Sequence, residues 1–117
     1  KKNGRIINIS SGGWTYGGNK DTFHFGASKA ALEALTIAFA KIGAPDNILV
    51  NAIRPGATET PGHLQRYPDK TKFLARANLV PLKRMAKPSE ISNMVLFLAS
   101  AKSSFITNTI IKVSGGE

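Results

Sequence analysis

Several kinds of residue and segment are missing from this sequence of 117 residues. It has no cysteine, which excludes disulfide bonds and thiolate metal sites and favours a reducing compartment, so we expect a cytoplasmic protein. No apolar run approaches the length of a membrane span, and no charged-then-apolar leader opens the chain, so we expect no membrane association. Histidine, aspartate and glutamate do not cluster at metal-ligand spacings, so we predict no metal site. Because the chain begins at Lys1 rather than at methionine, we expect a piece of a longer protein or a processed product.

Acidic residues are scarce as well. Seven Asp and Glu residues stand against 16 Lys and Arg residues, and the formal net charge is +9. Seven of the basic residues fall between Arg66 and Lys87, where Asp69 is the single acid. An excess of positive charge favours polyanionic partners such as nucleic acids, acidic proteins or phosphorylated cofactors. No zinc-finger or aromatic RNA-binding motif accompanies the basic run, so a solvated surface is the favoured interpretation and nucleic acid is not an expected partner.

What the sequence does contain is an alternation of short apolar runs and helical patterns. Three runs rich in isoleucine and valine predict strands at 5–10, 48–53 and 109–113, and the first strand is expected to be largely buried. Helices are predicted over 25–42, where small and apolar residues recur at spacings of three and four, and over about 88–100. Strands that alternate with helices predict an α/β fold with a parallel sheet covered on both faces.

The remaining segments lack a regular period. Residues 12–22 are rich in Gly, Asn, Asp and Thr, which predicts a flexible loop containing Tyr16. Residues 57–88 form a long insertion, with short helices predicted near Leu64 and over 72–78. The last predicted helix is expected to bury five apolar residues, namely Ile91, Met94, Val95, Phe97 and Leu98.

The first predicted strand has no earlier strand in this chain with which to pair. An open apolar strand edge promotes association between chains. The predicted helix over 25–42 also carries many small residues, which allow close packing against a neighbouring helix. We therefore expect the missing part of the domain to be N-terminal and the chain to form a homo-oligomer.

Five stretches resemble the short-chain dehydrogenase/reductase family in order and spacing: GRIINISS, FGASKAALEALT, ILVNAIRPGATET, PLKRMAKPSEISNMVLFLAS and ITNTIIKVSGG. The resemblance implies that residues 1–117 are a partial domain, the C-terminal half of a Rossmann-like doubly wound parallel sheet, with three strands and crossover helices. It also implies NAD or NADP as the cofactor and a small-molecule carbonyl or alcohol as the substrate. The family's Gly-rich pyrophosphate turn, the residue that selects NAD or NADP, and the catalytic asparagine are absent from this chain.

The same resemblance implies catalytic or cofactor-binding roles at seven positions: Ser11, Phe25, Lys29, Pro55, Gly56, Thr58 and Thr60. In the family, the serine at the position of Ser11 stabilises charge on the substrate oxygen, and Ser10 is the less favoured neighbour for this role. Lys29 is implied to bind the nicotinamide ribose and to lower the pKa of an acid one helical turn away. The turn that begins at Pro55 is implied to contact the carboxamide and a phosphate. Thr58 departs from the family there, because a branched apolar residue is usual at that position.

Phe25 is the main departure from the family pattern, which has a tyrosine at this position as the proton donor. Phenylalanine has no proton to transfer, so the favoured interpretation of Phe25 is packing. His24 lies about 100° around the helix and does not share the face of Lys29. Tyr16, in the predicted loop, is a less favoured substitute that would have to reach into the site.

Three functions remain open from the sequence. The first is an NAD(P)-dependent oxidoreductase that needs its N-terminal half, so that this chain alone is not a competent enzyme. The second is a catalytically inactive member of the family that acts as a binding or assembly module. The third, the least favoured, is a basic domain that binds polyanions. The substrate itself is not implied, because much of the family's substrate pocket lies in the variable insertion at 57–88.

Overall fold

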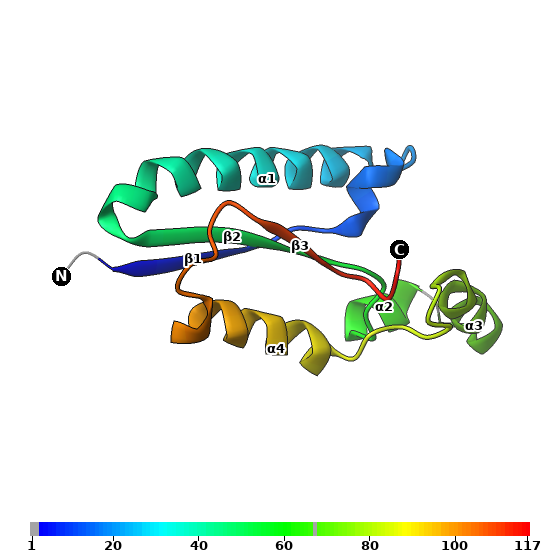
Figure 1. The fold of residues 1–117 in the computed structure, drawn as a ribbon. Helices are drawn as coiled ribbons and strands as arrows, with labels where there is room; N and C mark the ends of the chain where they lie inside the picture. Colours follow the sequence, from blue (N-terminus) through cyan, green and yellow to red (C-terminus); the bar gives the residue numbers. More distant parts are fainter. Residues whose placement is uncertain (1–2, 67) are drawn as a thin grey trace.

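The computed structural model describes residues 3–66 and 68–117 of the chain (Figure 1). Three parallel strands form one sheet in the order β1-β2-β3, and they are β1 (Gly4–Ile9), β2 (Ile48–Pro55) and β3 (Ile110–Val113). Helix α1 (Phe23–Gly43) covers one face of this sheet and helix α4 (Pro88–Ala99) covers the other (Figure 1). The predicted α/β fold, with a parallel sheet and crossover helices, is confirmed.

Strand β2 forms the centre of the core. Its residues from Leu49 to Ile53 are all buried, because strands flank it on both edges and helices cover both faces. Asn51 is the one polar residue in this run, and both ends of its side-chain amide form a hydrogen bond. Its amide nitrogen donates to the Ile106 carbonyl oxygen at 2.8 Å, and its amide oxygen accepts from the Thr109 N–H at 3.1 Å. Asn51 therefore has a structural role, because it joins β2 to the segment that leads into β3.

Strand β1 lies at the edge of the sheet, and the prediction that it is largely buried is wrong. Its side chains are half-buried or exposed, with Ile6 at 43% and Ile9 at 42% exposure. The physical reason is that β1 has a strand neighbour on one side only, where Gly4 to Ile9 pair with Ile48 to Ile53 of β2. The apolar edge that the sequence predicts to be open is therefore present.

Helix α1 is confirmed, but its buried face includes two polar side chains and no large apolar one. The buried residues of α1 are Gly26, Glu33, Thr36 and Ala40. The apolar residues that define its period lie on the opposite face, where Leu35 is 49%, Phe39 46% and Ile42 70% exposed. After Gly43 the chain continues as a short 3-10 helix over 44–46. The helical period thus predicted the element correctly but did not show which face is buried.

Helix α4 begins with Pro88 in its first turn, where the missing N–H costs no hydrogen bond, and the Glu90 side chain accepts from the Lys87 N–H at 2.8 Å. Leu98 is completely buried, but Phe97 is 37% exposed, so the prediction that Phe97 is buried is wrong. The other three predicted residues, Ile91, Met94 and Val95, are half-buried. Leu98 points between α4 and the sheet, whereas Phe97 is one residue, or about 100°, around the helix. A 3-10 helix over 101–103 leads from α4 toward β3.

The insertion between β2 and α4 contains the two short helices that the sequence predicts, α2 (Pro61–Arg66) and α3 (Lys70–Leu79). Asp69 caps α3, since its carboxylate accepts from the Thr71 N–H at 2.8 Å. The insertion also has a small core of its own, formed by Ala57, Ala77, Val80 and Met85 with Phe73 packed against it. None of the helices in the described parts of the chain is long and apolar enough to cross a membrane.

The segment predicted as a flexible loop over 12–22 begins instead with a 3-10 helix, η1 (Gly12–Tyr16). The Ser11 side chain caps this helix by accepting from the Gly13 N–H at 3.1 Å. Gly17 ends it with a φ of 74°, a conformation that glycine adopts without a steric penalty. The composition of this segment indicated turns correctly but did not predict the short helix η1.

Candidate functional site

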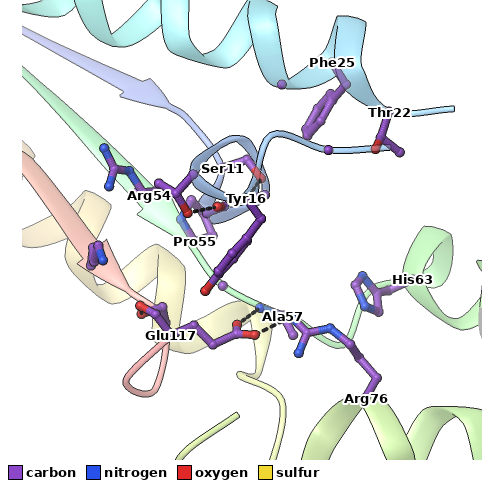
Figure 2. Close-up of a pocket in the computed structure, with 18 of the residues that line it drawn as sticks. Ser11, Tyr16, Thr22, Phe25, Arg54, Pro55, Ala57, His63, Arg76 and Glu117 are labelled. Carbon is purple, nitrogen blue, oxygen red and sulfur yellow. Dashed lines mark hydrogen bonds and ion pairs between the residues drawn. The ribbon is translucent and has the colours of Figure 1, made fainter. Parts of the chain in front are cut away.

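The carboxyl ends of the strands meet at a cavity of about 530 Å³ (Figure 2). Ser11 follows the end of β1, Pro55 ends β2 and Ser114 follows β3, and all three residues line this cavity. The first turns of α1 and the insertion complete its walls. In open α/β sheets, ligands bind in the crevice outside the carboxyl ends of the strands. The cavity therefore lies where this architecture places its ligand.

Four of the seven residues that the resemblance singled out share this cavity, namely Ser11, Phe25, Pro55 and Gly56. They come from three elements that are distant in sequence: the segment after β1, the start of α1 and the end of β2. Gly56 is required by a close approach, because a Cβ there would lie 2.8 Å from the Ser114 Cα atom. The tertiary structure thus brings Ser11, Phe25 and the Pro55–Gly56 turn together around one cavity.

The other three predicted residues lie outside the lining of the cavity and make structural contacts. The Lys29 ammonium donates to the Ile9 carbonyl oxygen at 2.8 Å and lies 5.6 Å from the centre of the Phe25 ring. The Thr58 hydroxyl donates to the Gly56 carbonyl oxygen at 3.0 Å. The Thr60 hydroxyl accepts from a backbone N–H in the first turn of α2, at 3.2 Å. All three are therefore next to a residue of the cavity wall: Lys29 lies near Phe25, Thr58 bonds Gly56, and Thr60 bonds His63.

The two neighbouring serines have different surroundings. The Ser11 hydroxyl oxygen accepts from Gly13 and lines the cavity, so its own proton remains available for a ligand. Ser10 is 3% exposed, and its hydroxyl donates to the Glu33 carboxylate at 2.6 Å. Ser11 therefore faces the cavity, whereas Ser10 belongs to the buried interior.

Phe25 and Tyr16 both line the cavity, and they approach it from different elements (Figure 2). The Phe25 ring projects from the first turn of α1 and is 44% exposed, so it does not pack into a closed core. Tyr16 is the last residue of η1, is 69% exposed and extends into the cavity (Figure 2). His24 lies outside the lining, and its ring meets the neighbouring Phe23 ring edge to face at 5.6 Å.

A buried polar network beneath the cavity was not predicted from the sequence. One oxygen of the Glu33 carboxylate accepts from Ser10 at 2.6 Å, from the Trp14 indole at 2.8 Å and from the Arg54 Nε at 2.9 Å. Its other oxygen forms an ion pair with the Arg54 guanidinium at 2.5 Å. The Arg54 guanidinium also lies 4.9 Å from the centre of the Trp14 ring. The available signals were Glu33 within an apolar helix and Arg54 at the end of an apolar strand.

The ionisation of this network follows from its contacts. Burial raises the pKa of Glu33, but hydrogen bonds from Arg54, Ser10 and Trp14 outweigh the burial, and the net shift is downward. The hydrogen bond to Glu33 raises the pKa of Arg54. Both groups are therefore charged at neutral pH, and they join α1 and β2 to η1.

The carboxylate of Glu117, which lines the cavity, is held by two donors of the chain itself. Glu117 accepts from the Ala57 N–H at 3.0 Å and from the Arg76 guanidinium at 2.5 Å (Figure 2). Lys112 also lines the cavity, and Glu117 occupies both the Ala57 N–H and the Arg76 guanidinium in this structure. The carboxamide of a nicotinamide would fit the Ala57 N–H if it displaced the Glu117 carboxylate. In the part of the chain that the structure covers, no group of three His, Asp or Glu side chains converges as a metal site would.

A three-stranded parallel sheet with crossover helices, and a cavity at the carboxyl ends of its strands, defines a Rossmann-like α/β protein. A family model described as enoyl-(acyl carrier protein) reductase matches residues 1–117. The chain belongs to the short-chain dehydrogenase/reductase family, as the resemblance implied.

Three similar proteins show how this chain compares with the family. The 3-oxoacyl-(acyl-carrier-protein) reductase FabG of Thermotoga maritima is 40% identical over 116 residues, which are 99% of this chain and 46% of that protein. The acetoacetyl-CoA reductase of an Acinetobacter species is 37% identical over 119 residues, 99% of this chain and 46% of that protein. A crystal structure of actinorhodin polyketide ketoreductase with NADPH has a TM-score of 0.88 at 31% identity and covers 98% of this chain and 47% of that one. The chain thus spans about half the length of the relatives it matches.

Proposed function

We propose that residues 1–117 are the C-terminal half of an NAD(P)-dependent oxidoreductase that interconverts a carbonyl and an alcohol. The observation that carries this proposal is the cavity that joins Ser11, Phe25 and the Pro55–Gly56 turn at the carboxyl ends of the strands. In this proposal the Ser11 hydroxyl donates to the substrate oxygen as negative charge develops there. The similarity to reductases of which this chain spans 46% supports a missing N-terminal half.

In the same proposal, the cofactor is NAD or NADP, which supplies or accepts the hydride when bound. Pro55, Gly56 and the Ala57 N–H would contact the nicotinamide end, and Lys29 would reach the ribose after releasing Ile9. Thr58 and Thr60 would place the following turn against the cofactor. The pyrophosphate has no Gly-rich cradle in this sequence. We therefore expect the isolated chain to bind either nucleotide only weakly, and a micromolar dissociation constant in calorimetry would contradict this.

The outer face of α1 supports a homo-oligomer. Leu35, Phe39 and Ile42 are exposed on this face, and small residues between them allow a second helix to approach closely. The β1 edge is a separate exposed surface, which the missing N-terminal half would cover. Sedimentation of the chain at micromolar concentration is expected to show a dimer or a larger species.

A second candidate function is favoured by Phe25 itself. Without a phenol at this position, the chain could be a catalytically inactive family member that acts as a binding or assembly module. The exposed apolar face of α1 would serve such a role equally well. The two candidates differ in one property, which is whether the parent protein transfers hydride.

The deciding experiment is hydride transfer by the parent protein, in which residues 1–117 are joined to their N-terminal half. The panel begins with 3-oxoacyl thioesters, on which relatives such as acetoacetyl-CoA reductase act by name, and continues with simple ketones and alcohols. Phe25→Tyr adds a hydroxyl at the cavity wall, and general acid catalysis contributes about 10²–10⁴-fold. Phe23→Tyr is the matched control, because it adds the same hydroxyl at a position 61% exposed and outside the cavity. Inactivity of the parent and of Phe25→Tyr would favour the binding module.

A further inference from the structure

We propose that Tyr16 supplies the acidic hydroxyl that Phe25 lacks. This inference rests on the proposed oxidoreductase function and names a further catalytic residue for it. Among the described residues that line the cavity, Tyr16 is the one that carries a phenol. It follows Ser11 by five positions, and both residues line the cavity.

The backbone that carries Tyr16 is an ordered turn. The Thr15 hydroxyl donates to the Gly12 carbonyl oxygen at 2.7 Å, and the Gly17 N–H donates to the Trp14 carbonyl oxygen at 3.0 Å. Ser11 caps the first turn of the same helix. These contacts close η1 at both ends, so Tyr16 leaves the backbone in a defined direction.

The turn is also fastened to the rest of the site through Trp14. The Trp14 indole donates to the buried Glu33 carboxylate on α1 at 2.8 Å. Its ring lies against the Arg54 guanidinium at the end of β2, at 4.9 Å. The elements that carry Phe25 and Pro55 therefore also hold the turn that carries Tyr16. The Glu33 network thus holds η1 in a fixed position relative to α1 and β2.

The Tyr16 side chain is placed to reach a ligand. Its ring extends from η1 into the cavity, with the hydroxyl on the side of Pro55 and Glu117 (Figure 2). Its high exposure leaves room for the ring to turn about its side-chain bonds toward a substrate oxygen bound at Ser11. The two arginines of the cavity are less suitable donors. Arg54 and Arg76 are held by carboxylates, and a guanidinium does not give up its proton in proteins.

In the direction of reduction, the substrate carbonyl gains a hydride at carbon and a proton at oxygen. When bound, a reduced nicotinamide would supply the hydride, whose electron pair would form the new C–H bond at the carbonyl carbon. The π electron pair of the carbonyl then takes the Tyr16 proton and forms the O–H bond of the alcohol. The electrons of the broken Tyr16 O–H bond remain on the phenolate oxygen, and water returns a proton to it. The carbonyl is reduced and the nicotinamide is oxidised.

Moving the phenol hydroxyl from position 16 to position 25 of the parent protein tests the inference. Tyr16→Phe is expected to lower the turnover rate about 10²- to 10⁴-fold. Adding Phe25→Tyr to this variant is expected to restore most of the rate, whereas Phe23→Tyr is expected to restore none of it. An active parent that keeps its rate in Tyr16→Phe would overturn the inference and leave the proposed function intact. A parent that is inactive until Phe25→Tyr is introduced would also overturn it. A parent that stays inactive in every variant would overturn the proposed function, and the inference with it.

Ligand binding gives a second readout that does not depend on turnover. A complex of the parent with reduced nucleotide and the alcohol product cannot react, so its dissociation constant is measurable by calorimetry. Loss of one hydrogen bond from Tyr16 is expected to weaken product binding about 2- to 10-fold in Tyr16→Phe. The melting temperature is expected to stay unchanged, because the Tyr16 side chain is largely exposed. Unchanged product affinity in Tyr16→Phe would contradict a contact between Tyr16 and the reacting oxygen.

Discussion

The two faces of helix α1 reverse the usual arrangement of a surface helix. The inner face presents Glu33 and Thr36 to the sheet, and both are at most 4% exposed. The outer face presents Leu35, Phe39 and Ile42 to solvent. The inner polar groups are stable because each has hydrogen-bond partners, and they tie the helix to the candidate site. Nothing in the described residues covers the outer apolar face. One face of α1 therefore positions the site, and the other is an exposed apolar surface of the kind that marks an interaction site.

The largest effect is expected on the inner face. Glu33→Ala would leave the Arg54 guanidinium buried without its carboxylate and would remove the acceptor of Ser10 and Trp14. Removing one partner of a buried ion pair costs about 3–5 kcal/mol. Urea unfolding should report this loss in the free energy of unfolding. The double variant Glu33→Leu with Arg54→Leu removes both charges and is expected to lose less than Glu33→Ala. If Glu33→Ala were as stable as the wild type, the network would not contribute to the stability of the fold.

The next effect concerns the outer face. Leu35→Glu with Phe39→Glu places two charges on the exposed stripe of α1 and should weaken self-association about 30-fold or more, since central apolar contacts contribute about 2 kcal/mol. The measurement is sedimentation over a range of concentrations. Leu79→Glu is the matched control, because Leu79 is 74% exposed on α3. Equal association in all three proteins would remove the outer face of α1 as the contact, and a monomeric wild type would refute the homo-oligomer.

Measuring the free energy of unfolding as a function of pH should show how much of the Glu33 contribution depends on its negative charge. Because the pKa of Glu33 in the folded chain lies below its ordinary value of 4.5, the carboxylate stabilises the fold fully above that pH. Its contribution is lost as the pH falls through the folded pKa. The stability difference between wild type and Glu33→Gln is therefore expected to be constant near neutrality and to shrink below about pH 4.5. Glu59→Gln, at an exposed residue, controls for the loss of one negative charge. A difference that grows on acidification would contradict this linkage.

The smallest effect compares one conservative change on each face. Thr36→Val keeps the shape of a fully buried side chain but removes the acceptor of the Asn8 amide, a hydrogen bond of 2.8 Å. We expect a loss of about 1 kcal/mol in the free energy of unfolding. Ile42→Val, at a residue 70% exposed on the outer face, is expected to change the stability of the monomer by less than about 0.5 kcal/mol. Equal effects at both residues would mean that the two faces do not differ as described.

The identity of the elements was available from the sequence, since apolar period, Pro88 and the glycines mark helices, strands and turns. The resemblance also pointed to Ser11, Phe25 and the Pro55–Gly56 turn, which share the cavity. The sequence did not show that β1 and Phe97 are partly exposed, because burial depends on neighbours that a linear pattern does not name. The seven-residue site assignment and the cofactor stay proposals.

By itself, the sequence determined the family, the order of strands and helices, and the absence of a phenol at position 25. These properties are local, because they depend on residue type and on spacing along the chain. Only the tertiary structure decided that Glu33 and Arg54 pair beneath the site, that α1 turns its apolar face outward, and that Tyr16 extends into the cavity. These features join residues that are distant in sequence, and their contacts exist only when β1, β2 and α1 pack together.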